Sequence, residues 1–340
     1  MIFEVEPGPG VTDLFAALCH RCNEPREAEV RFVGSGKAAI RLIFEHLRIA
    51  GVLEHKMTPV MVPPWLGTWV YAEMLPFAFP TLDALGAKAL LCYHQYGFPQ
   101  DMNRVVDIAA SRNMVLIEDC AHACSSQYKG QKLGSFGEYS LFSYSKFAFC
   151  FALGGVVSRH DGFYSFVDQV CAKGSTALRA LVNVFKLFDE ANLHLSRPVM
   201  PTVLTGLRKM AYARYGDQTL PGPRAIAMWQ RKRAYEVKAR LENYALLRRE
   251  LDYCGICDHL ESDGIAPYAV PLAVKSDKAG FVTTQLRAAG ISADVRKFDF
   301  ARCCFEPDYR KCVVVPIHSG MVGQGMDRLI SCLKQTFQAR

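Results

Sequence analysis

The chain has 340 residues, of which 50% are hydrophobic and 21% are charged. This composition is sufficient to bury a core and excludes a globally disordered chain, and the length suggests about two domains. The formal net charge of +7 is small. It favours an anionic small-molecule ligand and lacks the dense basic stripe that nucleic-acid binding requires.

Two sequence features bear on location. The acidic start of the chain lacks the positive charge of a signal peptide, and the most apolar stretch, 147–157, is shorter than the roughly 20 residues of a membrane span. The chain has 13 cysteines, which we expect to be reduced thiols of a cytoplasmic protein. The pairs Cys19/Cys22 and Cys254/Cys257 lie too far apart for a two-pair zinc site, so we expect ordinary packing rather than a metal or redox role.

The first half of the chain alternates predicted helices and strands. Ile40, Ile43, Phe44 and Leu47 share one face of the first helix. Helices are expected at 37–50 and 101–111, and strands at 59–62, 87–93, 114–117, 139–143 and 155–158. Strands connected by helical crossovers predict an α/β fold with a mostly parallel sheet flanked by helices.

The pattern changes after about residue 160. Residues 161–222 are irregular, and 224–251 form a long basic helix whose charges we expect on a solvated face. Strands are then predicted at 268–274, 291–295 and 311–317, and helices at 278–289 and from 325. We therefore expect a large domain over 1–222 and a smaller α+β domain over 223–340.

A glycine-rich turn precedes the first helix. Gly34, Ser35 and Gly36 lead directly into it. Free N–H groups and the positive end of the helix dipole at such a turn form an anion site. Alternatively, these residues only cap the helix.

Two further segments place reactive side chains after buried strands. Asp119 follows the strand at 114–117, where open α/β sheets bind ligands, and His122 lies close behind it. The alternative is that Asp119 caps the next helix beside a structural histidine. Lys146 follows Ser143 in an otherwise apolar run. Burial would lower the pKa of this amine and make it nucleophilic, unless the side chain extends to the surface.

Together these segments predict a pyridoxal phosphate site. The glycine-rich turn and Ser143 would hold the phosphate, and Asp119 would face the pyridine nitrogen and keep it protonated. Lys146 would form the internal aldimine. An aromatic ring should cover the cofactor. Trp65 is our candidate and Trp69 the alternative, although either could belong to the core.

The ordered set of motifs resembles the fold-type-I pyridoxal phosphate enzymes, and specifically the DegT/DnrJ/StrS sugar aminotransferase family. The resemblance covers most of the chain, is strong over 30–157 and is thin over 160–225. The matching words are GSGKAAI (34–40), VPPW (62–65), YGFPQDM (96–102), IEDCAHA (117–123), YKGQKLGSFGEYSLFSYSK (128–146) and GGVV (154–157).

The resemblance implies roles for individual residues. Lys146 would be the aldimine lysine and the proton shuttle, Asp119 the pyridinium partner, and His122 a hydrogen-bond partner of the cofactor's phenolic oxygen. The phosphate would be held by Ser35, Gly36, Ser143 and Lys37, the last standing where the family has a small hydroxyl residue. No metal ligand is implied.

The resemblance also implies an activity. We expect a homodimeric aminotransferase that moves an amino group from an amino acid, with glutamate as the expected donor, to a keto-sugar, a nucleotide-linked keto-sugar or a cyclitol-like ketone. Neither a nucleic acid nor a membrane is an expected partner. Two alternatives remain: a pyridoxal phosphate-dependent lyase or replacement enzyme, and a non-catalytic scaffold or regulator on the same fold.

Overall fold

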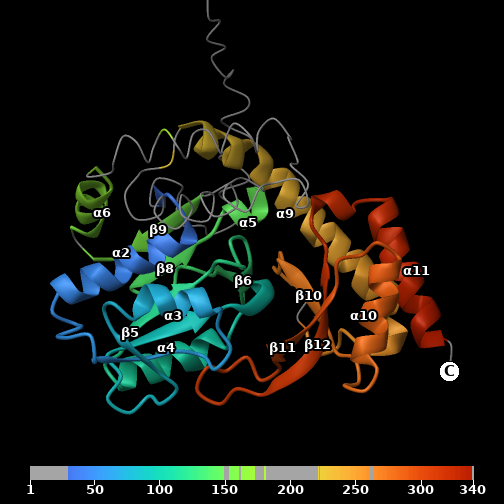
Figure 1. The fold of residues 1–340 in the computed structure, drawn as a ribbon, viewed down its shortest axis with the longest axis horizontal. Helices are drawn as coiled ribbons and strands as arrows, with labels where there is room; N and C mark the ends of the chain where they lie inside the picture. The colour runs from blue at the N-terminus through green and yellow to red at the C-terminus, as the bar shows by residue number, and fades with distance from the viewer. Residues whose placement is uncertain are drawn as a thin grey trace, which may run out of the picture.

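The computed structural model of the chain describes residues 30–148, 153–160, 162–172, 180, 221, 223–260 and 263–338 (Figure 1). The pair Cys19/Cys22 and most of the segment 161–222 lie outside these residues. Cys254 and Cys257 are both free thiols, beside the short 3₁₀ turn η3 (Asp252–Cys254). No helix in the described ranges is both long and apolar enough to cross a membrane.

The main sheet has seven strands in the order β1-β9-β8-β5-β4-β2-β3. Among the strands that the structure describes in this sheet, β9 alone runs opposite to the others, which confirms the predicted mostly parallel sheet. The strands are β1 (Arg31–Val33), β2 (Pro59–Met61), β3 (Phe79–Thr81), β4 (Ala89–Tyr93), β5 (Val115–Asp119), β8 (Tyr139–Phe142) and β9 (Gly154–Ser158). A hairpin of β6 (Gln127–Tyr128) and β7 (Gln131–Lys132) stands apart from this sheet.

Helices cover both faces of the sheet because alternate strand residues point to opposite sides. Leu91 packs in the core that includes α2 (Gly36–Ile49), whereas Leu90 packs in the core that includes α4 (Met102–Ser111). Three further helices are α3 (Thr68–Met74), α5 (Ser145–Ala148) and α6 (Phe163–Ala172), and η2 (Gln95–Gly97) is a 3₁₀ turn.

The C-terminal part is a second layer with its own core. Its antiparallel sheet has the order β10-β12-β11, and α9, α10 and α11 lie on one side of it (Figure 1). The elements are α9 (Pro223–Leu251), β10 (Ala269–Leu272), α10 (Ala279–Ala288), β11 (Asp294–Asp299), β12 (Tyr309–Pro316), η4 (Ser319–Met321) and α11 (Gln324–Gln338). This layer has the predicted α+β character.

Three sequence expectations need correction. The strand expected at 114–117 continues through Asp119. The strand expected at 291–295 begins only at Asp294, where pairing with β12 starts, because Ile291 is buried in the connection before it. The charged face of α9 is not fully solvated, since Glu236 and Arg240 are buried.

Helix α9 belongs to both cores. Trp229 near its start stacks on Tyr144, with 4.7 Å between the ring centroids, and Tyr244 near its end packs in the C-terminal core. A domain boundary at residues 222/223 stays a prediction. The helix that begins there, α9, packs both in the core of the large sheet and in the C-terminal core.

Candidate active site

Two neighbouring strands bring the predicted lysine and aspartate together. Asp119 ends β5, and Lys146 lies in α5 just after β8, the parallel neighbour of β5. Parallel strands end at the same edge of a sheet, which is where open α/β folds bind ligands. Asp119 is 2% exposed, and its Oδ1 accepts a hydrogen bond from the backbone N–H of Ala121 at 2.9 Å.

The two side chains shift each other's pKa. Burial lowers the pKa of Lys146 to about 8, although the charge of Asp119 acts in the opposite direction. Burial raises the pKa of Asp119, and the charge of Lys146 opposes that rise. A substantial fraction of the Lys146 amine is therefore neutral and nucleophilic just above neutral pH.

The residues predicted to hold the phosphate also lie close together, at the start of α2 and the end of β8. Ser35 is fully buried and caps α2, since its Oγ accepts a hydrogen bond from the N–H of Ala38 at 3.1 Å. A Cβ on Gly36 would lie 3.0 Å from the Cβ of Ser143, and a Cβ on Gly154 would lie 2.4 Å from the backbone carbon of Ser35. Glycine is therefore required at 154 and favoured at 36 for the turn, β8 and β9 to approach this closely. Ser35 thus does cap the helix, and the cap stands beside Ser143.

The two candidate tryptophans lie in different surroundings. The ring of Trp69 is 5.7 Å from Nζ of Lys146 and 5.7 Å from Nζ of Lys37. Trp65 is 48% exposed, and its ring lies 4.3 Å from Nζ of Lys297 and 6.4 Å from the ring of Tyr309. The alternative candidate, Trp69, therefore lies beside the reactive lysine. The sequence prediction missed this preference because it did not anticipate α3, the helix that carries Trp69.

His122 lies in a stack of aromatic rings that the sequence did not reveal. It is parallel to Tyr268 at 4.4 Å and to Tyr96 at 5.8 Å between ring centroids. Its Nδ1 lies 2.6 Å from the hydroxyl of Tyr93, and the ring of Tyr268 is 6.0 Å from Nζ of Lys146. Burial, and then the charge of Lys146, lower the pKa of His122 well below its usual value, so the ring is neutral. Tyr96 lies in one of the matching sequence motifs, YGFPQDM (96–102), but no local signal marks Tyr268.

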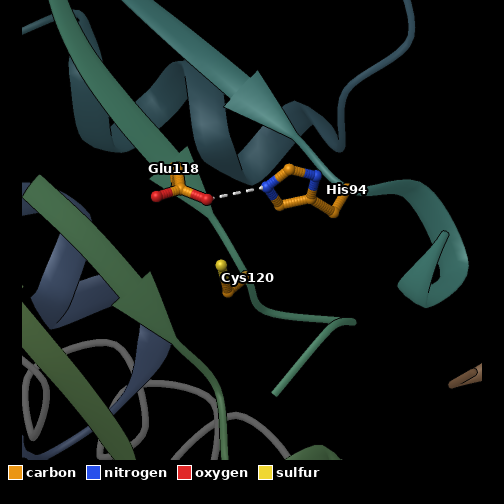
Figure 2. A group of neighbouring side chains, drawn as sticks. All are labelled: His94, Glu118 and Cys120. Atoms are coloured by element: carbon orange, nitrogen blue, oxygen red, sulfur yellow. Dashed lines mark hydrogen bonds and ion pairs between the residues drawn. The ribbon is translucent and has the colours of Figure 1, made fainter. Parts of the chain in front are cut away.

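A second group of polar side chains lies close to this site. His94, Glu118 and Cys120 are fully buried, and their potential ligand atoms lie within 4.8 Å of one another (Figure 2). Glu118 accepts three backbone hydrogen bonds of 2.7–2.8 Å from the turn at 134–137, and a further one from Nε2 of His94 at 3.2 Å. Nδ1 of His94 accepts from the N–H of Gln100 at 3.3 Å, so Nε2 carries the proton. Because both oxygens of Glu118 and both ring nitrogens of His94 already have hydrogen-bond partners, we assign the group to the fold rather than to metal binding.

Comparisons with known proteins point to the same family as the sequence motifs. Residues 83–177 match the sequence model of the DegT/DnrJ/EryC1/StrS aminotransferase family. Over these residues the chain is similar to the DegT/DnrJ/EryC1/StrS aminotransferases. The GDP-perosamine synthase of Escherichia coli O157:H7 is 53% identical over 57 residues, which are 17% of this chain and 16% of that protein. A dTDP-3-amino-3,6-dideoxy-alpha-D-galactopyranose transaminase of Aneurinibacillus thermoaerophilus is 32% identical over 96 residues, 28% of this chain and 26% of that one. The chain thus aligns with only a small part of these relatives' lengths.

Solved structures of aminotransferases extend the similarity to the whole fold. The Helicobacter pylori aminotransferase PseC, involved in the biosynthesis of pseudoaminic acid, has a TM-score of 0.66 at 12% identity, covering 96% of this chain and 90% of that one. A DegT DnrJ EryC1 StrS aminotransferase from Brucella abortus has a TM-score of 0.64 at 15% identity, covering 97% and 91%. The predicted fold-type-I class, with its large α/β part and smaller α+β part, is confirmed.

Proposed function

We propose that the chain is a pyridoxal phosphate-dependent aminotransferase that moves an amino group from an amino acid, with glutamate as the expected donor, to a keto-sugar, a nucleotide-linked keto-sugar or a cyclitol-like ketone. One observation carries the proposal. A lysine whose pKa is about 8 lies beside a buried aspartate at the carboxyl edge of the sheet. Side chains with pKa values shifted in this way, at the ligand-binding edge of a fold, are typical of active sites.

The residues of the site fit the cofactor. When bound, pyridoxal phosphate carries the amino group from donor to acceptor and withdraws electrons from the carbon that gains or loses a proton. The start of α2 has no acidic residue in its first turn, so its N–H groups, Ser143 and Lys37 suit a phosphate dianion. Trp69 provides an apolar face beside both lysines. A putative sugar aminotransferase from Streptococcus pneumoniae that shares this fold has been solved in PLP and PMP forms.

Lys146 would have two tasks in this reaction. Its Nζ would be the group that holds the cofactor when the site is loaded. Nζ would also give and take the proton that the substrate carbon gains or loses, for which a pKa near the working pH is best suited. Asp119 would then need another cationic partner, because its buried charge is balanced by Lys146 in the free protein. A protonated ring nitrogen would provide that partner.

The named relatives support the substrate class. They include GDP-perosamine synthases, a transaminase of a dTDP-linked amino sugar, and an L-glutamine:2-deoxy-scyllo-inosose aminotransferase of Streptomyces kanamyceticus. Amino sugars and a cyclitol therefore both occur among related reactions. A homodimer, as the resemblance implies, and a cytoplasmic location, as the expected reduced thiols suggest, are part of the proposal.

The decisive experiment combines a spectrum with covalent trapping. The protein is mixed with pyridoxal phosphate, its visible spectrum is recorded, and the sample is reduced with borohydride and mapped by peptide mass spectrometry. We expect the adduct on Lys146 and none in Lys146→Ala, whereas Lys88→Ala, which removes an exposed lysine, should retain it. Absence of the adduct in the wild type, or its location on another lysine, would refute the proposal and favour a scaffold.

A donor screen then distinguishes transfer from lyase chemistry. Glutamate or glutamine should convert the bound cofactor stoichiometrically to pyridoxamine phosphate, and a keto-sugar acceptor should reverse this conversion. Release of a keto acid without accumulation of the pyridoxamine form would indicate a lyase or replacement enzyme.

A further inference from the structure

One face of α9 carries buried polar side chains, although most of the helix's charges are exposed. Glu236, Arg240 and Asn243 are 2%, 1% and 4% exposed, and their spacing places them on the same side of the helix. Glu236 lies 3.3 Å from the backbone N of Ser319, and Asn243 donates to the carbonyl of Ile317 at 3.0 Å. This face therefore fastens the helix to loops of the C-terminal layer.

Arg240 has the largest set of partners on this face. Its Nε bonds to Oε1 of Glu236 at 2.7 Å, and its Nη1 donates to the carbonyls of Pro267 and Tyr268 at 3.1 and 2.6 Å. Its guanidinium carbon also lies 4.8 Å from the ring centroid of Phe147 and 5.6 Å from that of Tyr268. A planar guanidinium fixes such an arrangement in a way that a flexible ammonium does not.

These partners lie directly beside the proposed reaction centre. Phe147 follows Lys146 in α5, and the ring of Tyr268 lies parallel to His122 at 4.4 Å between centroids. Arg240 thus contacts the residue after the lysine and the ring that stacks on the histidine. It does so from the helix that contributes to both cores of the protein.

We propose that Arg240 is a positioning residue of this site, which holds Tyr268, and through it the plane of His122, in register with the turn that carries Lys146. The part that concerns amino transfer rests on the proposed function. The part that concerns His122 depends only on the packing. Loss of Arg240 would leave the buried carboxylate of Glu236 without its charge partner and two carbonyls without their donor, so Tyr268 would lose its fixed orientation.

The test uses a matched pair of variants on α9. Arg240→Met removes the proposed contacts. Arg248→Met is the control, because Arg248 also donates to a backbone carbonyl, that of Leu260, and to the hydroxyl of Tyr244, eight positions further along the helix. The ring resonances of His122 are followed in histidine-labelled protein without cofactor and are assigned with His122→Asn.

In Arg240→Met we expect the chemical shifts of the His122 ring to move away from the values that stacking on Tyr268 gives them. In Arg248→Met these chemical shifts should stay unchanged. The rate of amino transfer in a single turnover should fall about 10- to 100-fold in Arg240→Met only, as for a displaced reactive group. If Arg240→Met does not fold, Arg240→Lys carries the test. A single ammonium nitrogen cannot occupy the separate positions from which Nε and Nη1 donate, so the same resonances should move to a smaller extent.

Two results would overturn the proposal: a folded Arg240 variant with unmoved His122 resonances, or an equal change in Arg248→Met. The spectroscopic readout needs no cofactor, so it separates the two hypotheses. Moved resonances without an adduct on Lys146 would refute the aminotransferase proposal alone. An adduct with unmoved resonances would refute the positioning role alone.

Discussion

Each face of strand β5 carries one buried carboxylate, and the two carboxylates differ sharply in their partners. Glu118 and Asp119 are consecutive, so they point to opposite faces of the sheet. Glu118 accepts three backbone hydrogen bonds and one from His94, whereas Asp119 accepts one from Ala121 and pairs electrostatically with Lys146. A carboxylate whose oxygens are filled by the backbone stabilises the fold, and one that faces a titratable amine remains available for chemistry.

Lys146→Ala should have the largest effect on the Asp119 side. The variant loses both the point of covalent attachment and the proton-transfer group. Because the second contribution alone is worth about 10²–10⁴-fold, the rate of amino transfer should fall by at least that factor in a single-turnover assay. Lys88→Ala should match the wild type, and a wild-type rate in Lys146→Ala would show that the mechanism is wrong.

Glu118→Gln should lower the free energy of unfolding by about 1–3 kcal/mol in urea titrations, because its amide would face backbone N–H groups and leave a buried donor without an acceptor. Asp119→Asn keeps an oxygen for the N–H of Ala121 and should change stability less. Equal destabilisation of the two variants would contradict the structural role of Glu118. Loss of the adduct on Lys146 in a folded Glu118→Gln protein would contradict it as well.

Asp119→Asn should instead change the titration of Lys146. The charge of Asp119 raises the pKa of that amine, whereas burial lowers it to about 8. Removing the charge should therefore move the pKa below 8, so the lysine becomes reactive at lower pH. The pH dependence of Lys146 modification by an amine-selective reagent, read by mass spectrometry, measures this shift. An upward shift would contradict the electrostatic assignment, and Glu118→Gln serves as the control.

The two tryptophans provide the smallest expected effect. Trp69→Leu should weaken pyridoxal phosphate binding roughly 2- to 10-fold, which corresponds to the loss of one aromatic contact. Trp65→Leu should change it less, since the ring of Trp65 lies against Lys297 and Tyr309. Titration of the cofactor absorbance distinguishes these outcomes, and a larger loss in Trp65→Leu would restore Trp65 as the covering ring.

The sequence by itself determined the parts of this protein that depend on local pattern. The apolar period of α2, the glycine-rich turn with Ser35, the buried strands and the lysine in an apolar run are all readable within a few residues. They placed Asp119 after one buried strand and Lys146 after another, and the structure shows that these two strands are parallel neighbours. The family resemblance came from the same short sequence motifs.

The tertiary structure decided the contacts between distant segments. It brought Trp69 rather than Trp65 beside Lys146, stacked Tyr268 on His122, and buried Arg240 on a helix whose charge pattern predicted a solvated face. The short strands β1 and β3 also escaped prediction, because, unlike β2, they are not continuous buried apolar runs. A local pattern shows which side of an element is apolar, but the partner of a buried charge or ring is fixed only when separate elements pack together.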